Sequence, residues 1–284
     1  MIKRLISFLI IIFVLVHCKN KNEKPVISTT VDSTERTIKK PVNNCTNIEF
    51  ENTSNTIHII VALCDNKYQG IIPVPEKIGN GQDPKNNLYW GTAYGIKSYF
   101  RRSPNWTLKH AKQVDSIILE RIIFKHKTKD YTIVADAYDG KYIKNATETF
   151  LRSSAGIEKD IININKDTIG IKGNSNLVAY IGHDGLMDFQ LNEKFINTDH
   201  KKRDVIILAC YSKNYFQPHL EKANVNPLVW TTGLMAPEAY TIHDAIEGYI
   251  NKESNEAIIL RAAKAYNRYQ KCGLQASKRL LVSE

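Results

Sequence analysis

Five short apolar segments, spread along the chain and separated by longer amphipathic or polar stretches, constrain the fold more than any other feature. They are Ile57–Leu63, Tyr131–Ala135, Leu177–Ile181, Val205–Ala209 and Leu228–Thr232. Apolar runs of this length are typical of strands that are buried on both faces. Such strands belong to a parallel sheet, because helices cover both of its faces. We therefore predict an α/β fold: a mostly parallel sheet flanked by helices in a three-layer sandwich.

The segments between these strands supply the expected helices. Apolar residues at helical spacing predict helices at Asn87–Arg102, at least the first part of Lys112–Phe124, Asn145–Arg152, Ala239–Asn251 and Asn255–Lys271, and Asn163–Lys172 is expected to be a short hairpin. No repeat at a solenoid period is visible.

The N-terminus has the pattern of an export signal. A basic pair, Lys3-Arg4, precedes the twelve-residue apolar run Leu5–Val16, which is short for a membrane span and fits a signal peptide. The run ends in Leu15-Val16-His17-Cys18, which resembles the lipobox of bacterial lipoproteins, although His17 stands where that family usually has a small residue. The resemblance implies a lipid on Cys18. An uncleaved N-terminal anchor is the alternative, and both place the protein at a membrane outside the cytoplasm.

Three parts of the chain follow from this pattern. Residues 1–18 are the predicted lipoprotein-type signal peptide, 19–50 a flexible tether rich in Lys, Asn, Thr and Ser, and 51–284 the α/β domain with its C-terminal helices. The formal net charge of +10 includes contributions from the first two parts, so the domain carries only a modest basic excess. We expect a lipid-anchored protein of the cell envelope, facing the periplasm or cell surface, with no nucleic-acid partner.

A histidine and a cysteine each follow one of the predicted strands. Gly182-His183 comes after Leu177–Ile181, and Cys210 comes after Val205–Ala209. Because parallel strands end on the same edge of a sheet, the two side chains are expected to meet in one crevice. A thiol beside an imidazole is a nucleophile beside a base.

These residues resemble the signature of the caspase-like (clan CD) cysteine peptidases, which include caspases, gingipains and CHAT domains. In that signature four hydrophobic residues precede His-Gly, and four more precede a residue plus Cys; Val178–Ile181 with His183 and Val205–Leu208 with Cys210 are similar to it. Asp184 stands between His183 and Gly185, where the family usually has His followed directly by Gly.

The resemblance implies a cysteine endopeptidase that acts on a peptide or protein. Cys210 is the expected nucleophile and His183 the general acid and base, since the thiolate is the attacking species. The backbone N–H groups of Gly185 and Cys210 are the expected oxyanion donors. Asp65, at the end of the first strand, is the expected substrate contact for Lys or Arg, and the alternative is that Asp65 caps a turn.

Two other functions remain open from the sequence. One is a metal-dependent hydrolase, because Asp65, Asp136, Asp139, His183 and Asp184 could share a sheet edge, but no paired-ligand motif supports it. The other is a non-catalytic binding lipoprotein on the same fold, for which Asp184 is the main argument. We expect no cofactor and no metal.

Overall fold

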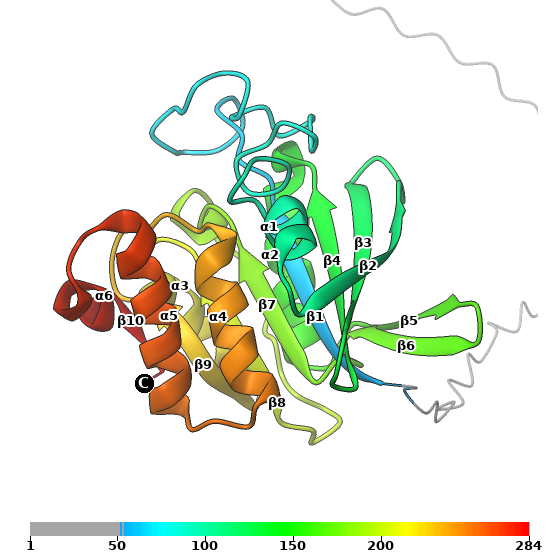
Figure 1. The fold of residues 1–284 in the computed structure, drawn as a ribbon. Coiled ribbons are helices and arrows are strands. Elements are labelled where there is room, and N and C mark those ends of the chain that lie inside the picture. The colour runs from blue at the N-terminus through cyan, green and yellow to red at the C-terminus, as the bar shows by residue number, and fades with distance from the viewer. Residues whose placement is uncertain (1–51, 53, 284) are drawn as a thin grey trace, which may run out of the picture. The chain divides into compact units, whose positions relative to one another are not determined.

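The computed structural model of this chain describes residues 52 and 54–283. Its central element is an eight-stranded sheet in the order β10-β9-β8-β7-β1-β4-β3-β2, shown in Figure 1. A two-stranded sheet lies beside it, formed by β5 (Lys159–Ile164) and β6 (Asp167–Lys172).

Five neighbouring strands of the large sheet are parallel. They are β4 (Tyr131–Tyr138), β1 (Asn55–Ala62), β7 (Leu177–Ile181), β8 (Arg203–Leu208) and β9 (Val225–Thr231). Antiparallel pairs extend the sheet at both sides: β3 (Ile118–His126) pairs with β4 and β2 (Trp106–Lys112) pairs with β3 on one side, and β10 (Leu281–Val282) pairs with β9 on the other. All five residues of β7 are buried, as expected for a central strand covered on both faces.

Helices cover both faces of this sheet. On one face, α1 (Ile96–Arg102), α4 (Ala239–Ile250) and α5 (Asn255–Gln270) pack on side chains such as Ile59. On the other, α2 (Ile143–Ser154) and α3 (Ser212–Leu220) pack on side chains such as Ile60. The last helix, α6 (Leu274–Leu280), leads into β10. The α/β prediction, with its mostly parallel sheet and three layers, is confirmed.

The predicted strands and most predicted helices are present, with shifts of a few residues at their ends. Two predictions were wrong. Lys112–Phe124 contains no helix; it holds the end of β2 and most of β3, because its apolar residues lie in a strand between β2 and β4. In Asn87–Arg102 the helix begins only at Ile96. The preceding residues form turns held by the Asn87 side chain, which bonds to the backbone of Cys64, Asn80 and Tyr89.

The parallel strands run toward a long loop at one edge of the sheet. Residues 63–95 leave the carboxyl end of β1 and form the extended loop coloured cyan in Figure 1. If the five parallel strands are numbered along the chain, their order in the sheet is 2-1-3-4-5. The chain builds the sheet outward in one direction from β1 to β4 and in the other from β7 to β9, so the switch point lies between β1 and β7. Ligands of open α/β sheets bind at the carboxyl ends of the strands next to such a reversal.

Candidate functional site

A cavity of about 260 Å³ opens at the carboxyl ends of the parallel strands. Cys210 and His183 both line it, as do residues of the loops after β1 and β9. The register explains the meeting, because Ile181 of β7 pairs with Leu208 of β8, and the two side chains follow these partners two residues later. The structure thus brings together the two residues that the sequence singled out.

Cys210 lies between β8 and the first turn of α3. It is partly exposed. The N–H of Met235 donates to its Sγ atom (3.5 Å), and the Sγ atom lies 3.7 Å from the carbonyl oxygen of the same residue. Tyr211, the next residue, has a left-handed backbone with φ 50°, which is uncommon outside glycine and is found at functional sites. This sharp change of direction ends the strand and starts the helix at Ser212.

The surroundings of the Cys210 thiol favour its neutral form. Burial raises its pKa, and the nearby Asp184 raises it further, while the Met235 N–H acts in the opposite direction. Since the thiolate is the nucleophile, attack by Cys210 requires a base to take its proton.

His183 is held in place by its own turn and by one carboxylate. Gly182 precedes it with φ 143°, and a Cβ atom there would lie 2.5 Å from the carbonyl oxygen of Ala62, so only glycine fits between the strands. The hydroxyl of Tyr180 donates to the His183 carbonyl oxygen (2.8 Å). The imidazole Nε2 lies 2.8 Å from Oδ2 of Asp188.

Asp188 is a site residue that the sequence did not reveal. An ionised carboxylate only accepts hydrogen bonds, so this contact favours the tautomer with its proton on Nε2, and Nδ1 of His183 has no hydrogen-bond partner among the described residues. The same Asp188 oxygen accepts the N–H of Gly70 at 3.0 Å, which ties the loop after β1 to the histidine. A short 3-10 turn, Gly185–Met187, brings Asp188 back to His183, and no spacing rule indicates this contact.

Asp184 is fully buried beneath the site. Its Oδ1 accepts the N–H of Leu186 (3.0 Å) and caps the turn, whereas its Oδ2 has no hydrogen-bond partner among the residues that the structure describes. Burial raises the pKa of Asp184 to about 7, the Leu186 N–H opposes this rise, and Asp188 adds to it. The residue inserted into the family-like motif therefore has a structural role as the cap of the turn.

The two expected oxyanion donors differ in their positions. Neither the N–H of Cys210 nor that of Gly185 donates a hydrogen bond within the described part of the chain. Cys210 lines the cavity, but Gly185 does not. The Cα atom of Gly185 faces Phe189 and Thr147, since a Cβ atom there would meet both side chains.

Asp65 is buried away from the cavity lining. Its Oδ1 accepts the N–H groups of Lys67 (2.8 Å) and Tyr68 (3.1 Å), and its Oδ2 accepts the amide of Gln82 (2.8 Å). Only 1% of the residue is exposed. These contacts favour the turn-capping alternative for Asp65 over a role as a substrate contact.

The acidic residues of the metal-dependent alternative do not converge on one point. Asp136 is bound by Arg121 and His58 in the sheet, and Asp139 accepts a hydrogen bond from Gln82 in the loop after β1. Within residues 52 and 54–283, no group of three or more His, Cys, Asp or Glu residues is placed to hold a metal ion.

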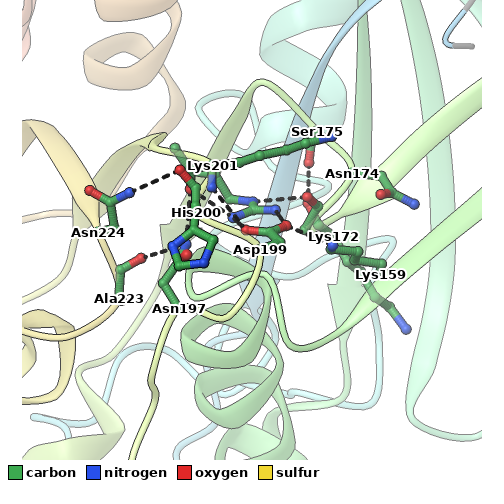
Figure 2. Close-up of polar contacts among 12 residues, drawn as sticks. Lys159, Lys172, Asn174, Ser175, Asn197, Asp199, His200, Lys201, Ala223 and Asn224 are labelled. Atoms are coloured by element: carbon green, nitrogen blue, oxygen red, sulfur yellow. Dashed lines mark hydrogen bonds and ion pairs between the residues drawn. The ribbon is translucent and has the colours of Figure 1, made fainter. Parts of the chain in front are cut away.

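A larger cavity, of about 360 Å³, lies at the opposite end of the parallel strands. Figure 2 shows its polar cluster, in which Asp199 is the central carboxylate. Asp199 forms ion pairs with Lys159 at 2.6 Å and with Arg203 at 2.5 Å, and it accepts a hydrogen bond from the backbone N–H of Lys201. Arg203 is only 3% exposed and also donates to the carbonyl oxygen of Gly173. These charges pair with one another, so the cluster fixes the loop before β8.

Comparisons of the chain with models of protein families, with curated proteins and with solved structures find no match in any of the three. The resemblance to caspase-like peptidases therefore rests on the residues around His183 and Cys210 and on the geometry described above.

Proposed function

We propose that this chain is a cysteine peptidase with Cys210 as nucleophile and His183 as general acid and base. One observation carries the proposal: the two side chains line the same cavity at the carboxyl ends of adjacent parallel strands. Asp188 supports it, because a carboxylate that holds the second nitrogen of the histidine leaves Nδ1 free to accept a proton.

The reaction follows from these groups. His183 takes the proton of the Cys210 thiol, and the thiolate attacks the carbonyl carbon of the scissile peptide bond. The carbon–nitrogen bond then breaks, and the imidazolium gives its proton to the leaving amine. Water hydrolyses the resulting thioester, which releases the carboxylic acid and restores the thiol. The N–H of Cys210, the one of the two expected donors that lines the cavity, is the proposed donor to the oxyanion.

Substitution of Cys210, which lines the cavity, and of Cys272, which lies outside it, tests this proposal. We expect Cys210→Ala and Cys210→Ser to reduce hydrolysis of a mixed fluorogenic peptide library to background, while both keep the circular dichroism spectrum of the parent. Cys272→Ala is the matched control, because Cys272 is an exposed thiol outside the cavity. Turnover retained by the Cys210 variants would refute the peptidase proposal.

A second candidate function is a non-catalytic binding lipoprotein, and the raised pKa of the Cys210 thiol, caused by its partial burial and by the nearby Asp184, favours it. Iodoacetamide labelling separates the two functions. A peptidase pair predicts fast alkylation of Cys210 near pH 7 that slows on His183→Ala, because an imidazolium stabilises the thiolate. A binding module predicts slow alkylation that rises only at alkaline pH and is the same in both proteins.

We also propose that a lipid on Cys18 anchors the protein at the cell envelope. The proposal rests on the lipobox-like Leu15-Val16-His17-Cys18, which lies outside the described residues. Among the residues that the structure describes, no helix is both long and apolar enough to cross a membrane.

A further inference from the structure

The lining of the Cys210 cavity is largely apolar, and several of its apolar side chains are open to solvent. Ile72 is 88% exposed, Leu234 65% and Met187 40%. They come from three different loops, after β1, β9 and β7, and face one cavity together with Met235 and Pro237. Large aliphatic side chains that gather at one opening mark a surface that binds an apolar group.

Charged groups are missing from the same lining. In the described part of the chain, the titratable side chains that line the cavity are those of His183, Cys210 and Tyr89, with no carboxylate, lysine or arginine. Glu238, next to Pro237 in sequence, is held by the Tyr240 hydroxyl at 2.9 Å. A lysine or arginine side chain entering this cavity would lose water without gaining a carboxylate partner, and an acidic side chain would find no cation.

The chemistry of the proposed reaction indicates which substrate residue fills the cavity. In the thioester, the residue on the acyl side of the broken bond is attached to Sγ of Cys210, so its side chain has to lie next to that atom. A volume of about 260 Å³ is below the 300–1,000 Å³ that is common for sites of whole small molecules. It is suited to a single large side chain.

We propose that this cavity is the specificity pocket for a large apolar residue, such as leucine, methionine or phenylalanine, on the acyl side of the scissile bond. The inference rests on the proposed peptidase function and deepens it. It replaces a preference for basic residues, because Asp65, the carboxylate expected to select them, is engaged in its own turn. A difference of one methylene group in an apolar pocket is commonly worth about 10- to 200-fold in rate.

Peptidyl chloromethyl ketones test the pocket without requiring turnover. Acetyl-Ala-Ala-X reagents with X as Leu, Lys or Asp are incubated with the full chain, and alkylation of Cys210 is followed by mass spectrometry. We expect the Leu reagent to react at least 10-fold faster than the other two. Equal rates, or a faster reaction with Lys or Asp, would overturn the inference.

Two exposed positions allow a matched mutant comparison. Ile72→Ser and Leu234→Ser should each reduce the rate with the Leu reagent several-fold and leave the rate with iodoacetamide unchanged. Ile196→Ser is the control, because Ile196 is 45% exposed and lies outside this cavity. A Leu preference that survives both pocket variants would also overturn the inference.

The two proposals can fail separately in this design. Normal reactivity of Cys210 toward iodoacetamide without discrimination among the three reagents refutes the apolar pocket alone. Leu-selective alkylation with no hydrolysis of the corresponding peptides refutes the peptidase and leaves an apolar binding cavity.

Discussion

Nε2 of the His183 imidazole lies 2.8 Å from Oδ2 of Asp188, and the same carboxylate oxygen accepts the N–H of Gly70 at 3.0 Å. One side chain thereby fixes the tautomer of the proposed base and the position of the loop that follows β1. A Cβ atom on Gly70 would lie 2.3 Å from the Asp188 carboxylate, so this approach depends on glycine.

Removal of the Asp188 carboxylate is expected to impair catalysis more than folding. We predict that Asp188→Ala lowers kcat for peptide hydrolysis on the order of 10²-fold, because the imidazole loses its orientation. Asp188→Asn, which keeps an acceptor at the same place, should lose less. Asp167→Ala, an exposed carboxylate on the hairpin, is the control. A higher KM with an unchanged kcat would show that Asp188 serves only to hold the loop.

The buried carboxyl of Asp184 should make stability depend on pH. Its pKa in the fold is about 7, raised mainly by burial, against about 4 for an exposed aspartate. Between these values the folded state holds a proton that the unfolded state has lost, so stability falls as pH rises from about 4 to 7. Asp184→Asn removes this dependence, and its stability relative to the parent should be higher at pH 8 than at pH 4.5 by roughly 1–4 kcal/mol.

Thermal melts of the parent and Asp184→Asn at both pH values measure this difference, and a gap that does not change with pH would contradict it. Asp184 also raises the pKa of Cys210. The same substitution should therefore speed alkylation of Cys210 by iodoacetamide at pH 8.

The ion network at Asp136 is expected to support folding and not activity. Arg121 donates two hydrogen bonds to this fully buried carboxylate, at 2.6 and 2.7 Å, and His58 lies 3.1 Å from it. Burial alone would raise the pKa of Asp136, but these contacts outweigh it and hold the pKa at about 2. Its stabilising effect is therefore present above about pH 4 and is lost as the pH falls toward 2.

Asp136→Ala leaves Arg121 buried without its partner and should cost about 3–5 kcal/mol in urea denaturation. Asp130→Ala is the matched control, since Asp130 pairs with Lys125 at the surface and should cost less than about 1 kcal/mol. Similar costs for both variants would show that burial does not govern this network.

Asp65 is expected to stabilise its turn without selecting substrates. Asp65→Ala breaks three hydrogen bonds and should lower the free energy of unfolding by about 1–3 kcal/mol. The relative rates with the Leu and Lys chloromethyl ketones should stay as in the parent. A selective change in the Lys rate would restore Asp65 as a substrate contact.

Membrane attachment is expected to depend on Cys18. Cells expressing Cys18→Ala should release the protein from the membrane fraction or retain its uncleaved precursor, because several acyl chains are needed for a stable anchor. Mass spectrometry of the mature N-terminus is the direct measurement. An unmodified N-terminus well beyond Cys18 in a freely soluble fraction would exclude the lipid anchor.

The sequence by itself determined the sheet and the two residues at its edge. Short, fully apolar segments such as Leu177–Ile181 are typical of central strands, and parallel strands end on the same edge of a sheet, so His183 and Cys210 were expected to approach each other. The prediction from local sequence was wrong in Lys112–Phe124, where the spacing of apolar residues fits both a helix and a strand. There the antiparallel pairing with β2 and β4 decided the outcome.

Only the tertiary structure decided what surrounds the thiol. Asp188 reaches His183 through a 3-10 turn, and Ile72, Met187 and Leu234 meet from three loops that are far apart in sequence. The direction of a loop depends on backbone turns and on hydrogen bonds to distant groups, which leave no periodic trace in the chain. For the same reason Asp65 could not be assigned from its position after a strand: its burial and its three hydrogen-bond donors come from the fold of the loop around it.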